Sequence, residues 1–143
     1  MILISTYTIT VGLGMDQDGW LLVARICVAA VYLYSGIDKI VNWAWSITFI
    51  KGLRLPQAPI VLTGTIVTQL LGSAAILLGF YAREGAGLLL IFTLVATAVA
   101  HNPIGLKGEE FRRQIMLSLE HLAIVGGLLL IAVVGPGSYA MRP

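Results

Sequence analysis

The residues that could do chemistry in this sequence are polar or ionisable side chains set inside otherwise apolar stretches. A charge held at the centre of a bilayer costs roughly 2.5–3.5 kcal/mol on insertion scales, so such residues normally face other helices, a cavity or the membrane surface. We therefore expect them to form a polar interior, which is the candidate functional site. The set comprises Arg25, Tyr32, Lys39, Gln69, His101, Glu120 and His121.

The first apolar stretch carries several of these residues at helical spacing. Arg25, Tyr32, Ser35 or Gly36, and Lys39 fall on one side of a helix, while apolar residues occupy the rest. One interpretation is that the two cations extend along the surface to opposite membrane interfaces. The hydroxyls and the glycine between them favour the other interpretation, a polar stripe that faces inward.

Glu120 and the two histidines raise the question of a proton site, a metal or a haem. Glu120 lies about two turns inside the last apolar stretch, so we expect a cation to neutralise it, or the acid to be protonated; a structural hydrogen bond between helices is the alternative. His121 should lie roughly 10 Å deeper than His101 at 1.5 Å per residue, whereas axial haem ligands must be level. A Zn, Fe or Cu site at His101, Glu120 and His121 would match no recognised ligand spacing. We expect neither a metal site nor an intrinsic cofactor.

The composition indicates a polytopic membrane protein. Of 143 residues, 58% are hydrophobic and 11% charged, and the mean hydropathy is +0.93. Soluble domains carry about 25% charged residues. A scattered net charge of +2 argues against nucleic-acid binding. The single cysteine, Cys27, excludes a disulfide or a thiolate metal cluster within the chain.

Apolar stretches of nearly bilayer-spanning length predict an all-α integral membrane protein, folded as a four-transmembrane-helix antiparallel bundle. We expect residues 1–19 to be a non-spanning N-terminal arm and residues 20–143 to be the membrane domain. The connection after the first span should contain a short amphipathic piece on the membrane surface. A tight turn is expected at 83–85 and a charged loop at 107–113. The predicted spans cover about 20–41, 60–81, 86–101 and 114–134.

The distribution of Lys and Arg predicts the orientation. Six basic residues on the side of the first and third connections, against three on the other side, place both termini outside the cytoplasm of a bacterial cytoplasmic (inner) membrane. The first side carries Lys39, Lys51, Arg54, Lys107, Arg112 and Arg113, and the second carries Arg25, Arg83 and Arg142.

A series of short motifs resembles the DoxX family of small four-helix membrane proteins. The motifs are Arg25 with the segment from Tyr32 to Lys39, Gly52 to Pro56, Gln69 to Gly72, Leu78 to Arg83, and Gly126-Gly127 followed by Gly135-Pro136-Gly137. The resemblance covers about residues 20–138, and its order and spacing are fairly specific. Gln69 is a departure, because glutamate often occupies this position in such sequences, so an acid role there is lost or moved.

The resemblance implies a membrane protein associated with redox systems, because related DoxD-type proteins belong to thiosulfate:quinone oxidoreductases and other members are linked to oxidative-stress complexes. The leading hypothesis is an accessory or quinone-proximal membrane subunit of a respiratory-type oxidoreductase complex, more a non-catalytic subunit than an enzyme alone. Its partners would be the lipid bilayer and other subunits, with quinone or lipid at the bundle. The alternatives are a small transporter or lipid-binding protein, and a purely structural membrane anchor.

Overall fold

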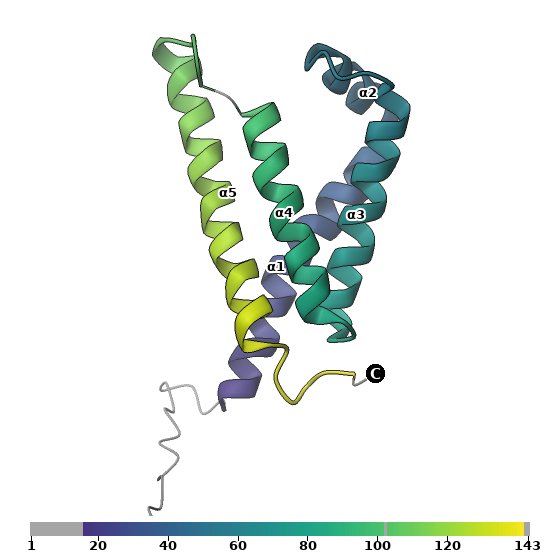
Figure 1. The fold of residues 1–143 in the computed structure, drawn as a ribbon, viewed down its shortest axis with the longest axis vertical. Coiled ribbons are helices and arrows are strands. Elements are labelled where there is room, and N and C mark those ends of the chain that lie inside the picture. Colours follow the sequence, from purple (N-terminus) through teal and green to yellow (C-terminus); the bar gives the residue numbers. More distant parts are fainter. Residues whose placement is uncertain (1–15, 102, 142–143) are drawn as a thin grey trace, which may run out of the picture.

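The chain folds into helices joined by short connections, as the computed structural model shows for residues 16–101 and 103–141 (Figure 1). Four of the described helices are long and apolar enough to cross a membrane, and neighbouring spans run antiparallel (Figure 1). The predicted fold class is confirmed, and the protein is a multi-pass membrane protein. The helices are α1 (Gln17–Val41), α2 (Trp43–Gly52), α3 (Ala58–Leu78), α4 (Ala82–Ala100) and α5 (Gly108–Val134).

α1 begins earlier than the sequence suggested. The side chain of Asp16 accepts a hydrogen bond from the backbone N–H of Gly19 at 2.8 Å, which satisfies one of the free donors at the helix N-terminus. Residues 17–19, assigned to the arm from sequence, therefore form the first turn of α1. The rest of the predicted arm, residues 1–15, lies outside the described residues.

The turn between α3 and α4 lies at residues 79–81 rather than at 83–85, so the second span is shorter and the third longer than predicted. Gly79 ends α3 with a φ of 76°, a left-handed conformation that glycine adopts without strain. Glu84 then falls in the first turn of α4, where a negative charge is favourable.

α5 also starts before its predicted position, because the segment expected as a charged loop is helical. Its first turn holds Glu109 and Glu110, which suit the positive end of the helix dipole. Arg113 forms an ion pair with Glu110 at 3.1 Å, one turn away on the same exposed surface. These charges therefore extend α5 past the predicted start at residue 114.

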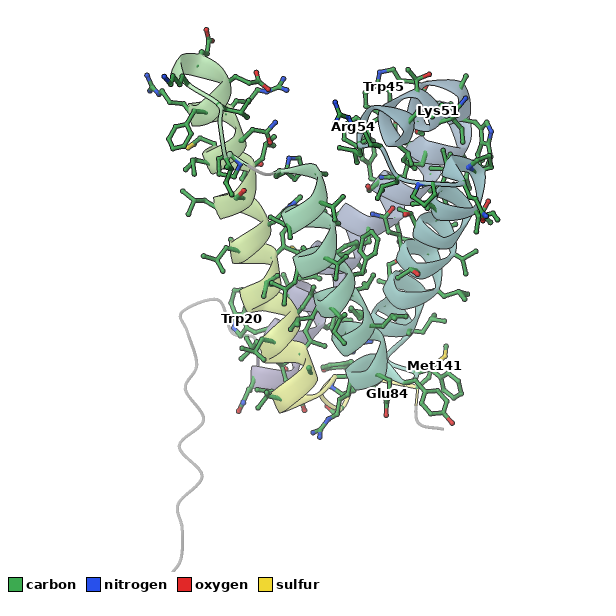
Figure 2. All side chains as sticks on the ribbon, turned by 45° about the horizontal axis from the view of Figure 1, so that its top comes forward. Trp20, Trp45, Lys51, Arg54, Glu84 and Met141 are labelled. Atoms are coloured by element: carbon green, nitrogen blue, oxygen red, sulfur yellow. The ribbon has the colours of Figure 1, made fainter. Side chains whose placement is uncertain are left out.

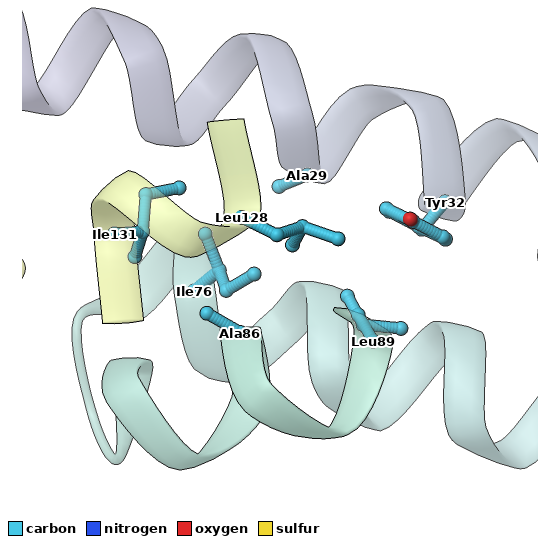
Figure 3. Packing of buried hydrophobic residues seen from close by; sticks show 7 residues of the cluster. All are labelled: Ala29, Tyr32, Ile76, Ala86, Leu89, Leu128 and Ile131. Carbon is cyan, nitrogen blue, oxygen red and sulfur yellow. The ribbon is translucent and has the colours of Figure 1, made fainter. Parts of the chain in front are cut away.

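The main core lies at the end of the bundle farther from α2 and draws on all four spanning helices (Figure 3). Helices α3 and α4 approach closely there, since a Cβ placed on Gly72 would lie 2.6 Å from Cγ of Leu89. Small residues at such crossings are typical of membrane helices. The buried residues of the cluster are Ala29, Tyr32, Ile76, Ala86, Leu89, Leu128 and Ile131.

The connection after α1 contains the short helix α2, where a short amphipathic piece was predicted; its position on the membrane surface stays a prediction. α2 packs on α3 and α1, with Ile50 buried against Leu62 and Ile66 of α3. Trp45, Lys51 and Arg54 gather at this end of the molecule, and Trp20 lies toward the other end (Figure 2). Tryptophan and basic side chains are the usual residues at membrane–water interfaces.

Candidate functional site

The polar stripe of α1 faces inward but serves two separate places. Arg25 is 1% exposed and Tyr32 is also buried, while Lys39 is half-buried near the other end of the helix. Arg25 and Lys39 are about 20 Å apart along the helix, at about 1.5 Å per residue. One stripe therefore supplies a structural cation at one end of the bundle and a cavity residue at the other.

Arg25 binds backbone carbonyls rather than reaching the membrane surface. Nε donates to the carbonyl of Ile76 at 2.8 Å, and Nη2 donates to that of Leu77 at 2.7 Å. Both carbonyls belong to the C-terminal turn of α3, where helix carbonyls lack partners within the helix and a cation is favourable. Nη1 donates to the carbonyls of Pro136 and Tyr139, at 2.9 and 2.8 Å. Arg25 therefore ties the C-terminal segment to the end of α3.

A cavity of about 420 Å³ occupies the half of the bundle nearer α2, between residues of all five helices. Its volume is in the range of small-molecule sites, which are mostly apolar with a few convergent polar groups. Of the predicted site residues, all but Arg25 and Glu120 line it. Its polar side chains are those of Tyr32, Ser35, Asp38, Lys39, Ser46, Thr65, Gln69, Thr93, His101 and His121.

Lys39, Ser35 and Gln69 form a hydrogen-bonded group in the cavity wall. The Lys39 ammonium donates to Oγ of Ser35 at 2.6 Å and to the carbonyl of Ser35 at 3.2 Å, and Gln69 Nε2 donates to the same Oγ at 3.3 Å. An ammonium has three N–H donors, so one is left. Within the described part of the chain, no carboxylate forms an ion pair with Lys39.

Gln69 also leaves a polar atom without a partner. Its Oε1 is buried, and no group in the described residues donates to it; the same holds for Oγ of Ser46 on α2. Turning the amide over only exchanges which of its two polar atoms lacks a partner. A buried polar atom without a hydrogen bond costs about 1–3 kcal/mol. With the amide in this orientation, Gln69 carries an unpaired acceptor in the cavity wall and Lys39 carries an unused donor.

The hydroxyl group and the backbone carbonyl of Thr93, together with the hydroxyl group of Thr97, connect Tyr32 with His121. The hydroxyl of Tyr32 is hydrogen-bonded to that of Thr93 on α4. One turn further on, the Thr97 hydroxyl donates to the Thr93 carbonyl at 2.7 Å and lies 2.7 Å from Nδ1 of His121. The Thr97 hydroxyl has a single proton, which it donates to the Thr93 carbonyl. In this arrangement Nδ1 of His121 donates to the Thr97 hydroxyl oxygen, and Nε2 is the ring nitrogen left for another partner.

The two histidines are in contact, which corrects the predicted difference in depth. Their ring centroids are 4.9 Å apart and the rings meet edge to face at 66°. Ser118 donates to the carbonyl of His101 at 3.3 Å, so α5 is level with His101 at Ser118, only one turn from His121. Nδ1 of His101 is paired with Oε1 of Gln114 at 3.0 Å. The direct ring contact leaves no space for an iron between the imidazoles. Among the described residues, no three His, Cys, Asp or Glu side chains are placed to hold a metal ion.

Glu120 does not belong to the interior, and this prediction was wrong. The residue is exposed, and no described group forms a hydrogen bond or ion pair with it. Adjacent residues on a helix point about 100° apart, so the inward orientation of His121 toward Thr97 turns Glu120 away from α4. Gly127 lies two turns further along α5 on the same side as Glu120, and it is Gly127 that packs against Val28 of α1. At the level of Glu120, this side of α5 is exposed.

Several cavity residues were not predicted. Thr93 is one of them, and its spacing of four residues from Thr97 and eight from His101 was the available signal. Ser46, Phe49 and Ile50 come from α2, whose position depends on the single turn residue, Asn42, between α1 and α2. Nothing in the spacing of residues indicates that this short helix forms one wall of the cavity.

Comparisons with known proteins agree on the kind of membrane domain. The DoxX family model matches residues 20–102. The inner membrane protein YphA of Escherichia coli (strain K12) is 25% identical over 128 residues, which cover 90% of this chain and 91% of the relative. The inner membrane protein YqjF of the same strain is 30% identical over 125 residues, which cover 87% and 91%. No solved structure matches.

Proposed function

The chain belongs to the DoxX family of membrane proteins, and from this premise we propose that it is a quinone-proximal accessory subunit of a membrane oxidoreductase. In this proposal, the cavity between the helices binds the polar ring of a quinone or its quinol. Electrons are exchanged with a redox centre of a partner subunit. The family resemblance supplies the redox context, and the cavity supplies the chemistry for the ligand.

The observation that carries the proposal is the pairing of an unused donor with an unused acceptor in an apolar cavity. The carbonyl oxygen of a quinone accepts a hydrogen bond, which the free N–H of Lys39 can donate. The hydroxyl of a quinol can also donate, and the buried Oε1 of Gln69 is an acceptor without a partner among the described residues. The two groups together therefore suit both redox states of such a ring.

The shape of the site supports a ring with apolar substituents. Apolar side chains make up most of the lining, and the aromatic rings of Tyr32 and Phe92 are among the lining groups that do not come from α2. Planar rings bind well against aromatic side chains, which contribute large apolar areas and favour offset or edge contacts. His121, with Nε2 as its second ring nitrogen, lines the same cavity and could exchange a proton with a bound quinol.

Ligand retention tests the proposed function. The detergent-purified protein is incubated with a benzoquinone carrying a decyl tail, passed through gel filtration, and the quinone that elutes with the protein is measured. We expect Gln69→Leu and Lys39→Met to lower retention about tenfold, the effect of losing one hydrogen bond to a buried group. Thr63→Val is the matched control, because Thr63 is exposed on α3 and its one side-chain hydrogen bond within the described chain goes to the carbonyl of Pro59.

Equal retention by the wild type and by Gln69→Leu would contradict the proposal. Mass spectrometry of the native protein provides the second arm, because a co-purifying phospholipid in place of a quinone would favour the lipid-binding alternative.

Purification in a mild detergent tests the assignment as a subunit. Redox subunits should co-purify with the chain, held by the N-terminal arm or by the charged first turns of α5. Recovery of only a cofactor-free homo-oligomer would contradict this assignment.

A further inference from the structure

One side of the cavity is lined by apolar residues that also face outward. Trp45 and Phe49 of α2 and Val95 and Val99 of α4 line the cavity, yet they are between 42% and 66% exposed. By contrast, Gln69 and Tyr32, also in the lining, are 5% and 4% exposed. The exposed residues therefore form the mouth of the cavity, and the polar groups lie deeper.

The helices on the two sides of this mouth do not pack against each other. In the described chain, α2 packs on α3 and α1, whereas α4 packs on α3 and α5. Figure 1 shows the end of α4 near His101 standing apart from α2, while the opposite ends of the spans come together. The gap between α2 and α4 is therefore a real opening of the cavity, since residues of both helices line it.

The mouth is apolar on both sides, as expected of an opening toward lipid. Val95 and Val99 lie in the last two turns of a membrane-spanning helix, and the opposite side carries the stacked rings of Trp45 and Phe49, with centroids 5.7 Å apart and planes at 14°. An apolar mouth of this kind gives no advantage to a ligand arriving from water. It does stabilise a hydrocarbon chain that lies across it, because apolar area is buried on both sides.

From this arrangement we infer that the ligand of the cavity is a tailed, membrane-dissolved molecule that enters sideways between α2 and α4. Its polar ring lies at Lys39 and Gln69, and its hydrocarbon tail remains in the α2–α4 mouth, between the Trp45–Phe49 stack and the valines of α4. This inference rests on the proposed function, because it takes the quinone ring as the polar part of the ligand. It adds that the tail is part of what the protein recognises.

Two probes that differ only in the tail test the inference on the full-length, detergent-purified protein. One is a tail-less benzoquinone, and the other is the same ring with a decyl tail. Val95→Trp fills the mouth without touching Lys39 or Gln69. Leu88→Trp is the control, since Leu88 is exposed two turns earlier on the same side of α4 and does not line the cavity. Unchanged melting temperatures show that both variants fold.

We expect Val95→Trp to lower the affinity for the decyl quinone about tenfold or more and the affinity for the tail-less ring less than about twofold. Leu88→Trp should change neither affinity. An equal loss for both probes, or no loss for either, would overturn the sideways entrance while leaving the ring site intact. Failure of the wild type to bind either probe would overturn the proposed function itself. A second variant, Phe49→Ala, should weaken binding of the decyl quinone selectively if the ring stack holds the tail.

Discussion

Arg25 shows how a charge can be buried in a membrane helix when no acidic side chain of the described residues forms an ion pair with it. Its guanidinium donates to backbone carbonyls at the C-terminal end of α3 and in the C-terminal segment. Charge-assisted hydrogen bonds of this kind are roughly twice as strong as neutral ones. The residue therefore stabilises two chain ends at once.

Replacing Arg25 should destabilise the protein more than any other polar substitution in α1. We expect Arg25→Ala to lower the free energy of unfolding by roughly 3 kcal/mol or more, because hydrogen bonds to charged groups contribute about 1.5–3 kcal/mol each. The free energy of unfolding of Arg25→Lys should lie between those of the wild type and Arg25→Ala, since one ammonium cannot reproduce the planar arrangement of donors. Thermal unfolding in detergent measures both. Wild-type melting of Arg25→Ala would contradict the role of the guanidinium.

Glu120 gives the opposite expectation. Because the side chain is exposed and has no bonded partner in the described chain, Glu120→Ala and Glu120→Gln should each change the free energy of unfolding by less than about 0.5 kcal/mol in detergent. The same thermal assay tests this. A large loss for Glu120→Ala alone would indicate that another chain, such as a partner subunit, covers this face of α5 in the purified protein.

At the scale of elements, the closeness of α3 and α4 depends on glycines of both helices, Gly72 of α3 and Gly85 of α4. A Cβ on Gly72 would meet Cγ of the fully buried Leu89 at 2.6 Å, whereas a Cβ on Gly64 of the same helix would meet nothing within 4 Å. Gly72→Ala should therefore lower the free energy of unfolding by about 1–3 kcal/mol through overpacking. Gly64→Ala should leave it unchanged or raise it by about 0.4–1 kcal/mol. Equal melting temperatures for the two variants would contradict the tight α3–α4 crossing.

Helical periodicity predicted those parts of the site that depend on one helix alone. The inward side of α1, with Arg25 and Tyr32, follows from residue spacing, and the small residues around Gln69 mark the buried face of α3. Spacing could not place Glu120, because its neighbour His121 has equal polarity and only the contact with Thr97 decides which of the two faces inward.

The other incorrect predictions concern the register between neighbouring helices and the residues at which helices begin and end. The contact between His101 and His121 depends on the register of α4 and α5, which the connection at 101–107 determines. The helix boundaries were displaced where a local cap, such as Asp16, or a left-handed glycine, such as Gly79, decides the end. The family resemblance supplied the fold and could not supply these distances.

At the scale of the whole molecule, the two ends differ in their basic residues, and this difference predicts the orientation. Lys51 and Arg54 lie with Trp45 at the end where the first and third connections are, which should face the cytoplasm (Figure 2). A reporter fused to the C-terminus should therefore report a location outside the cytoplasm, and one inserted at Gly105 a cytoplasmic location. The reverse pattern would overturn the orientation and move the N-terminus with it.

The bonds of Arg25 also bear on how the chain is synthesised. α1 leaves the ribosome before the other described helices, and the carbonyls of Pro136 and Tyr139 follow α5. Until the segment after α5 has been synthesised, the guanidinium in α1 therefore lacks half of its hydrogen-bond acceptors. The segment after α5 completes the burial of a charge that entered the membrane with α1.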